Sequence, residues 1–366
     1  MNHPITFGVV GGYGLSGSTV VSELWKSSRD SILIGGRDLG KAQALAAHFD
    51  NRVTTAPLDI LDPKSLDEFC SQCDIILNCA GPVSLLQDHV AQAALRARCH
   101  YVDPAGLTFV SERLVPHSQK IADLSLSFVV SAGWMPGLTE LLPAYVYAQS
   151  KLRMDSIDSL SVYFGDSGTW SASALRDAVF YVRQRGLRRP TYFHKGQRTP
   201  AKMSSGFRKI EIDKQLGTLQ FSMMSMPEQD EMARRFADCD VVTYAYVPSM
   251  KMLLAGSLIA LLPLSEATAV DLLGSAWRKN NLPVGGFVVV RAAGQTHGQS
   301  VESTSRIVFE KGQDYWINGL VMANVARVLA EGNDVRKGVH YLSDAVEPAA
   351  FLAALRAAGL NQTDRL

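Results

Sequence analysis

Residues 5–26, ITFGVVGGYGLSGSTVVSELWK, decide the fold class. An apolar run comes first, a glycine-rich turn follows, and a helical pattern begins at Ser18. The turn satisfies GxGxxG when it is counted from Gly12 and GxxGxxG when it is counted from Gly11, in the strand-turn-helix context that gives such a match its meaning. Glycines permit a tight turn and let backbone amides approach a pyrophosphate at the positive end of the helix. The stretch therefore predicts a Rossmann-type dinucleotide-binding domain.

Every residue of this turn is a candidate for contact with the cofactor. The alternative is a glycine-rich turn that binds nothing. The predicted binding residues are Gly11, Gly12, Tyr13, Gly14, Leu15, Ser16 and Gly17.

The residue after the second apolar run, SILIGG, indicates which nucleotide is bound. NAD enzymes usually carry a carboxylate about 20 residues beyond the last glycine, where it bonds the adenosine ribose. Arg37 stands at this point, and a guanidinium pairs well with a 2′-phosphate. The sequence therefore favours NADPH over NADH. Asp38 follows immediately, and a surface arginine without a role remains the alternative.

Two further strand ends are expected beside the cofactor, because ligands of open α/β sheets bind beyond the carboxyl ends of the strands. Asp59 follows the third apolar run and is placed near the adenine. The turn Ala80, Gly81 and Pro82 follows the fourth and is placed near the nicotinamide ribose. Each stretch can also be an ordinary loop.

Alternation of short apolar runs with helical patterns predicts repeated βαβ units and a doubly wound α/β fold. After a turn-rich junction at 133–137 the pattern changes to alternating strands, typical of an α+β substrate domain with an antiparallel sheet. We expect three parts: residues 1–133 as the NADP-binding domain, 134–317 as the substrate and dimerisation domain, and 318–366 as helices that return to the first domain. The expected strands of the first part are 6–10, 31–34, 53–58, 75–78, 101–103 and 128–130.

The composition favours a compact enzyme, with 47% apolar and 19% charged residues and a formal net charge of +1. This charge gives no global attraction to nucleic acid or to an anionic membrane.

The apolar run 250–264 is interrupted by Lys251 and Pro263 and predicts a buried helix and not a membrane span. Five thinly spread cysteines and the lack of an export signal predict a cytoplasmic protein. Cys70 and Cys73 form a CxxC that we interpret as packing, with no metal site.

The chain resembles the saccharopine-dehydrogenase-like reductases. The resemblance rests on GGYGLSG (11–17), IGGRD (34–38), CDIILNCAGP (73–82), CHYVDPAG (99–106) and SAGWMPGL (131–138), in the family's order, and on the closing stretch 338–360. It implies a nicotinamide hydride donor that faces a C=N or closely related acceptor in a cleft between the domains.

Within CHYVDPAG the resemblance places Cys99, Tyr101 and Asp103 beside the substrate. Strand alternation aims these three side chains to one side. Reduction of C=N requires a proton on nitrogen as hydride reaches carbon, so an acid must lie within hydrogen-bond reach. We therefore expect these residues to be catalytic, with a purely structural role at a strand end as the alternative.

The middle domain shows no clear set of arginines for substrate carboxylates, and its distinctive segment GTWSAS (168–173) predicts an apolar, aromatic-accepting pocket. Residues 183–214 hold ten Lys or Arg against two acids, a surplus that is a solvated basic face or a docking site for an acidic carrier protein. In these features the chain is similar to the thiazolinyl imine reductases of siderophore assembly, and we expect a homodimer. The alternatives are a saccharopine- or opine-type dehydrogenase, a reductase of an enoyl group on a lipid, and a non-catalytic NADPH-binding regulator.

Overall fold

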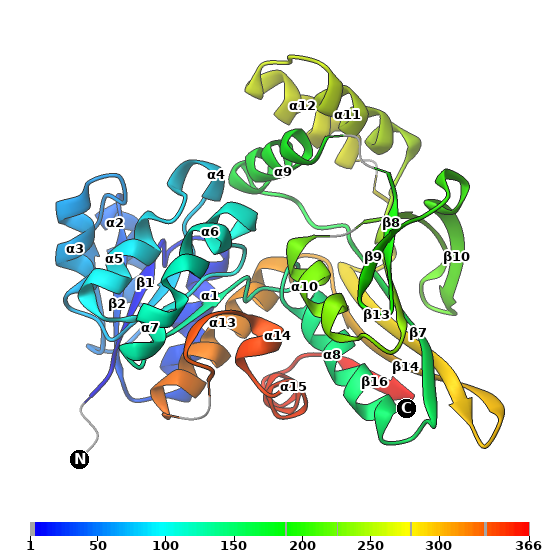
Figure 1. Ribbon diagram of the computed structural model, residues 1–366. Coiled ribbons are helices and arrows are strands. Elements are labelled where there is room, and N and C mark those ends of the chain that lie inside the picture. Colours follow the sequence, from blue (N-terminus) through cyan, green and yellow to red (C-terminus); the bar gives the residue numbers. More distant parts are fainter. Residues whose placement is uncertain (1–3, 187–188, 225, 279, 333–334, 366) are drawn as a thin grey trace. The chain divides into compact units, whose positions relative to one another are not determined.

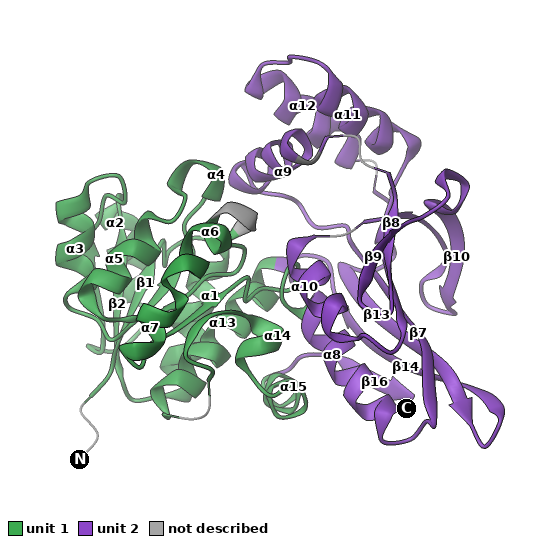
Figure 2. Cartoon of the chain, in the orientation of Figure 1, with its two compact units in different colours: residues 1–138, 315–358 green, residues 139–314, 359–366 purple. Residues whose placement is uncertain are grey.

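In the computed structural model, residues 4–186, 189–224, 226–278, 280–332 and 335–365 are described. The chain forms two compact units (Figures 1 and 2). Unit 1 comprises Met1–Leu138 and Tyr315–Ala358, and unit 2 comprises Thr139–Asp314 and Gly359–Leu366. The chain therefore passes between the units three times, near residues 138, 314 and 358.

Unit 1 is built on a sheet of seven parallel strands in the order β15-β6-β5-β4-β1-β2-β3. Its first six strands lie where the sequence predicts them, so the doubly wound fold is confirmed. The seventh, β15, comes from the C-terminal part of the chain and pairs with β6. The strands are β1 (Thr6–Val10), β2 (Ser31–Gly36), β3 (Val53–Pro57), β4 (Ile75–Asn78), β5 (His100–Val102), β6 (Ser127–Val130) and β15 (Gly338–Tyr341).

Both faces of this sheet are covered. Successive side chains of a strand point to opposite faces, and Val9 and Val10 of β1 are both fully buried. Side chains of Asp38 and Asp62 cap the helices after β2 and β3. The helices of unit 1 are α1 (Leu15–Ser27), α2 (Leu39–Ala46), α3 (Pro63–Cys70), α4 (Val83–Leu86), α5 (His89–Ala97), α6 (Leu107–Leu114), the 3₁₀ helix Val115–His117, α7 (Ser118–Asp123), α13 (Asp314–Ala330), α14 (Leu342–Ala345) and α15 (Pro348–Ala357).

Unit 2 is built on a nine-stranded sheet in which β10-β11-β12-β7-β13-β14-β16 form the main path. Its strands pair antiparallel, as the sequence predicts, except that β12 pairs with β7 in parallel, so the sheet is mixed. A period-two pattern reports the buried face of a strand but not its direction, and the long connection from β7 to β12 leaves room for a crossover. The strands are β7 (Ser156–Asp166), β8 (Thr191–His194), β9 (Gln197–Pro200), β10 (Phe207–Asp213), β11 (Gly217–Met223), β12 (Asp240–Tyr246), β13 (Gly286–Thr296), β14 (Gln299–Phe309) and β16 (Gln362–Arg365).

The end of the chain differs from the expectation that residues 318–366 all return to the first domain. Residues 318–358 fold with unit 1, but β16 pairs with β14 in the sheet of unit 2. The chain thus returns to unit 2 after α15.

The apolar run 250–264 forms a helix over Met250–Leu261 that is only partly buried, whereas the sequence predicted a buried one. In α11 (Met250–Leu261) only Ala255 and Ile259 are buried, whereas Met250, Leu254 and Leu261 are more than 60% exposed. One side of α11 packs with α9 and α12, and an apolar composition all round cannot show which side that is. Among the described residues, no helix is both long and apolar enough to cross a membrane. The helices of unit 2 are α8 (Leu138–Lys151), α9 (Ala172–Arg185), the 3₁₀ helix Met203–Ser205, α10 (Pro227–Arg235), α11 and α12 (Glu266–Trp277).

Candidate nucleotide-binding site

The glycine turn leaves β1 through a left-handed residue. Gly11 has φ +71°, and its N–H donates to the carbonyl oxygen of Gly35 at 2.8 Å, which ties the turn to β2. The N–H of Gly14 then donates to the carbonyl oxygen of Gly11 at 2.9 Å. Because a side chain is strained at this φ, glycine is required at position 11 for a reason of backbone geometry.

Helix α1 begins in contact with this turn. A Cβ on Gly17 would lie 2.4 Å from the carbonyl oxygen of Gly11 and 2.7 Å from the Cα of Gly12. No side chain caps the helix at Gly14, and its first turn contains no acid. Backbone N–H donors at a helix start attract anions, so this arrangement fits a pyrophosphate. Leu15, Ser16 and Gly17 form the first turn of α1.

Arg37 is exposed directly after β2, and within the described residues its guanidinium has neither an ion pair nor a hydrogen bond. The carboxylate of Asp38, whose negative charge would disfavour a 2′-phosphate, is bonded to Lys41. Its Oδ1 accepts the N–H of Lys41 at 3.0 Å, and its Oδ2 lies 3.2 Å from Lys41 Nζ. These hydrogen bonds from Lys41 hold the pKa of Asp38 below its usual value. Asp38 therefore caps α2, and the exposed charge left at the end of β2 is positive, which fits NADPH.

Tyr13 belongs to the glycine turn but contacts the end of β2. Its hydroxyl accepts the N–H of Asp38 at 3.2 Å. A Cβ on Gly36 would lie 2.4 Å from Cε1 of the Tyr13 ring, so the ring rests against the Gly36 backbone. The sequence assigns Tyr13 to the cofactor turn, but it gives no signal for this contact.

The residues that follow β3 and β4 differ in their contacts, and only those after β4 are seen to lie beside the glycine turn. Asp59 is exposed after β3, and its Oδ1 accepts the N–H of Leu61 at 3.0 Å, as in an ordinary turn. After β4, the backbone of Ala80 lies beside the glycine turn, since a Cβ on Gly11 would be 3.1 Å from Ala80 N. The peptide between Gly81 and Pro82 is cis. The Ala80–Pro82 segment is therefore adjacent to the predicted phosphate site.

A buried polar network lies below this segment. Asn78 Nδ2 donates to the Tyr101 hydroxyl at 3.2 Å, and Asn78 Oδ1 accepts the N–H of Ala80 at 3.2 Å. The Tyr101 side chain is only 1% exposed. Burial, together with the nearby charge of Asp103, raises the pKa of Tyr101 well above its usual value. Tyr101 is thus a neutral phenol that reaches the edge of the sheet through Asn78.

Asp103 follows β5 and is also buried, with 3% exposure. Its Oδ1 accepts the N–H of Ser131 at 3.1 Å, and its backbone carbonyl accepts the N–H of Ala132 at 2.7 Å. Asp103 therefore anchors the loop that follows β6, and its charge acts on Tyr101.

Cys99 lies at the other end of β5. Its thiol donates to the carbonyl oxygens of Cys70 and Cys73, at 3.3 and 3.0 Å. Burial raises the pKa of Cys99 to about 12. Strand alternation puts Cys99 on the same side as Asp103, but four residues of strand separate their Cα atoms by about 13 Å. We therefore correct the prediction and assign Cys99 to packing.

Helix α13 supports the site from a distant part of the sequence. Asn318 Oδ1 accepts the N–H of Trp134 at 2.8 Å and so fixes the loop after β6. A Cβ on Gly319 would lie 2.7 Å from the carbonyl oxygen of Ser16 in the first turn of α1. The sequence predicts helices in this part of the chain, but it gives no signal for the contact of Gly319 with α1.

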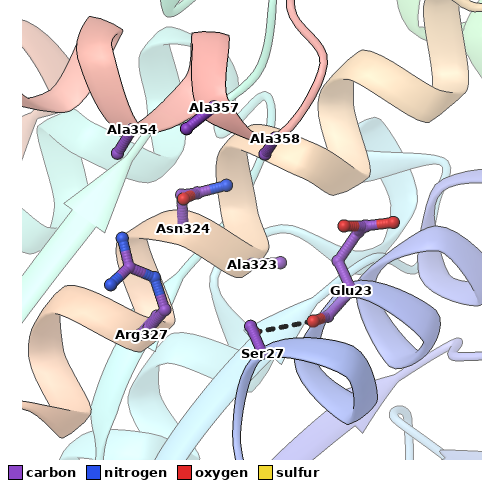
Figure 3. A pocket seen from close by; sticks show the side chains of 8 residues that line it. All are labelled: Glu23, Ser27, Ala323, Asn324, Arg327, Ala354, Ala357 and Ala358. Atoms are coloured by element: carbon purple, nitrogen blue, oxygen red, sulfur yellow. Dashed lines mark hydrogen bonds between the residues drawn. The ribbon is translucent and has the colours of Figure 1, made fainter.

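A pocket of about 270 Å³ lies elsewhere in unit 1, among α1, α13 and α15 (Figure 3). Its polar side chains include Glu23, Ser27, Asn324 and Arg327. The Ser27 hydroxyl donates to the carbonyl oxygen of Glu23, and Arg327 is paired with Glu331. Glu23 and Ser27 belong to the last turns of α1, whereas the glycine turn precedes its first, so this pocket is separate from the nucleotide site.

In unit 2, the segment 168–173 contributes to a buried corner. Trp170 Nε1 donates to Asp166 Oδ2 at 3.0 Å, and the Trp170 ring stacks on Trp277 with centroids 4.2 Å apart. Burial raises the pKa of Asp166 to about 7, and the nearby Asp314 also raises it. Ser171 caps α9. The aromatic pair and the buried carboxyl are thus held in one small cluster.

Comparison with known proteins identifies the domain that carries the nucleotide site. Residues 7–128 match the family described as the saccharopine dehydrogenase NADP-binding domain. The chain is 31% identical over 137 residues to a probable mitochondrial saccharopine dehydrogenase-like oxidoreductase of Arabidopsis thaliana, covering 34% of this chain and 30% of the relative. It is 24% identical over 199 residues to the human saccharopine dehydrogenase-like oxidoreductase, covering 46% of this chain and 45% of the relative. The chain thus spans less than half the length of these relatives.

The fold of the chain is that of a solved saccharopine dehydrogenase. The apo saccharopine dehydrogenase (L-Glu forming) of Saccharomyces cerevisiae superposes with a TM-score of 0.71 and 13% identity, covering 99% of this chain and 100% of that chain. At this identity the likeness establishes the fold.

Proposed function

From the premise that residues 7–128 are a saccharopine dehydrogenase NADP-binding domain, we propose that this oxidoreductase uses NADPH to reduce a C=N bond. The observation that carries the proposal is the guanidinium of Arg37, which has no partner among the described residues and lies at the same edge as the uncapped start of α1. Helix α1 would hold the pyrophosphate and Arg37 the 2′-phosphate. NADPH, when bound, supplies the hydride.

The residues around β4 and β5 supply the environment for proton transfer. A hydride that reaches an imine carbon leaves its electron pair on nitrogen, which then takes a proton. The phenol of Tyr101 is neutral, as for an ordinary tyrosine, and burial raises its pKa still further; Asn78 links this phenol to the backbone of Ala80. Because Tyr101 is buried and its oxygen accepts an N–H of Asn78, we assign the network to orienting the turn after β4, and the imine nitrogen takes its proton from solvent water.

For the substrate, we propose the thiazoline ring of a siderophore intermediate tethered to a carrier protein. Two features of unit 2 support it. The aromatic pair of Trp170 and Trp277 suits a flat, largely apolar ring. The segment 183–214 offers a basic surface for an acidic carrier, although Arg198 is paired with Asp230, and residues 187–188 lie outside the described part of the chain. The exposed cations of this segment include Arg189, Lys195, Lys202, Arg208, Lys209 and Lys214.

A second candidate is a saccharopine- or opine-type amino-acid dehydrogenase. The similarity of fold to the yeast enzyme over 99% of this chain favours it. The two candidates differ in whether the substrate carries free carboxylates beside the C–N bond. In both, the hydride travels between the nicotinamide and a carbon bonded to nitrogen.

The test is oxidation of NADPH by purified full-length protein with a carrier-tethered thiazoline, followed by mass spectrometry of the released product. We expect a gain of two mass units in the ring. In a parallel assay, saccharopine with NADP⁺ tests the second candidate through the formation of glutamate. NADPH binding without turnover in either assay would favour a non-catalytic regulator.

We further propose that the protein works as a homodimer in the cytoplasm. The support for a reducing compartment is that all five cysteines are free thiols. Light scattering of the purified protein tests the dimer.

A further inference from the structure

Tyr13 makes contacts that the binding of a pyrophosphate does not require. Its position in the glycine turn places its backbone at the phosphate site, yet its side chain extends to the end of β2. The ring occupies the space that a Cβ on Gly36 would fill, with Cε1 2.4 Å and the hydroxyl oxygen 2.7 Å from that point. The hydroxyl accepts the N–H of Asp38 at 3.2 Å. Tyr13 therefore contacts the residues on both sides of Arg37.

These contacts fix the backbone that carries Arg37. On one side of it, the ring of Tyr13 rests against Gly36. On the other side, Asp38 is held twice: its N–H by Tyr13, and its carboxylate by Lys41 at the start of α2. The Arg37 side chain is exposed between these fixed points. A guanidinium on a fixed backbone loses less freedom when it binds a phosphate.

We propose that Tyr13 determines the preference for the 2′-phosphorylated nucleotide by positioning Arg37. This rests on the use of NADPH by the domain. Tyr13 acts through the turn at Gly36 and Asp38, whereas Arg37 makes the contact with the phosphate. The preference for NADPH over NADH therefore depends on a residue after β1, Tyr13, as well as on Arg37 after β2.

The test is Tyr13→Phe, which keeps the ring and removes the acceptor. We expect NADPH and 2′,5′-ADP to bind about three- to tenfold more weakly by calorimetry, the effect of losing one hydrogen bond. NADH affinity should change less than twofold, because NADH carries no 2′-phosphate. In an Arg37→Ala background, Tyr13→Phe should cause no further loss. Tyr147→Phe, on α8 in unit 2, is the matched control: it removes a hydroxyl hydrogen bond to Asp238 and should leave both nucleotide affinities unchanged.

Gly36→Ala tests the same contact from the other side. Its new Cβ would displace the Tyr13 ring, so we expect a selective loss of NADPH and 2′,5′-ADP binding while the melting temperature stays near that of the wild type.

Three results would overturn the role of Tyr13. An equal loss for NADPH and NADH would mean that Tyr13 acts on the part common to both nucleotides. A loss that persists in the Arg37→Ala background would mean that Tyr13 itself binds the phosphate. Unchanged affinity in both variants would mean that the turn needs no support. Absence of NADPH binding in the wild type is a separate result, which would remove the proposed function itself.

Discussion

Two polar regions at the carboxyl edge of the unit 1 sheet differ in how their groups are satisfied. Around β1 and β2, the start of α1 has no side-chain cap and the guanidinium of Arg37 is exposed. Around β4 and β5, Asn78, Tyr101 and Asp103 are buried and bonded within the protein. In the first region, hydrogen-bond donors remain available to a ligand. In the second region, the polar side chains already form hydrogen bonds within the protein. This difference supports our proposal that the first region binds the cofactor and the second orients the groups beside it.

The strongest test of the first region is Gly17→Ala. A Cβ here would lie 2.4 Å from the carbonyl oxygen of Gly11, so the turn and helix must separate. We expect a destabilisation of about 1–3 kcal/mol and no NADPH binding that calorimetry can measure. Gly256→Ala in α11 is the control, because nothing lies within 4 Å of its new Cβ. Wild-type binding by Gly17→Ala would contradict the close packing of α1 on the turn.

The second region is tested by Tyr101→Phe and Asp103→Asn. If the network orients the groups at which hydride and proton arrive, turnover should fall on the order of 100-fold, while the Kd for NADPH stays within about threefold. Steady-state kinetics and calorimetry on the same preparations separate these quantities. Normal turnover in both variants would leave the network with a structural role only.

Arg37→Ala tests the first region through cofactor affinity, whereas the variants of the second region are expected to change turnover. Loss of a charge-assisted contact should weaken NADPH binding about ten- to hundredfold and leave NADH binding unchanged. Arg96→Ala serves as the control, since Arg96 is an exposed arginine of unit 1 that is paired with Asp67. If NADPH and NADH lose affinity together, Arg37 does not read the 2′-phosphate.

The smallest predicted effect is a pH dependence of the free energy of unfolding, caused by a buried carboxyl of unit 2. This carboxyl, like the groups of the second region, is bonded within the protein. Burial raises the pKa of Asp166 to about 7, so the folded state binds more protons than the unfolded state between pH 4 and 7. Stability from this group is therefore present at low pH and is lost as the pH rises, by about 1.5 kcal/mol from pH 5.5 to 7. Asp166→Asn should remove this slope in urea unfolding. An equal slope in wild type and variant would contradict it.

The first region was more predictable from the sequence than the second, for physical reasons. Phosphate binding needs glycines at fixed spacing within a single strand-turn-helix, so the turn and Arg37 could be located from local sequence alone. For β5, alternation gave the side of each residue but not its distance from the edge, so Cys99 was misplaced.

Contacts between distant segments had no local signal. The contact of Tyr13 with Gly36 and the support from Gly319 both depend on how elements pack, and the parallel pairing of β12 depends on the path of the chain. The exposed side of α11 could not be predicted either, because its sequence is apolar on every side.

The most direct test of the central claim is a calorimetric titration of the wild-type protein with NADPH and with NADH under the same conditions. The exposed guanidinium of Arg37, at the same sheet edge as the start of α1, predicts that NADPH binds at least about tenfold more tightly than NADH. Equal affinity, or no binding of NADPH at millimolar concentration, would contradict the assignment of this edge to a phosphorylated dinucleotide.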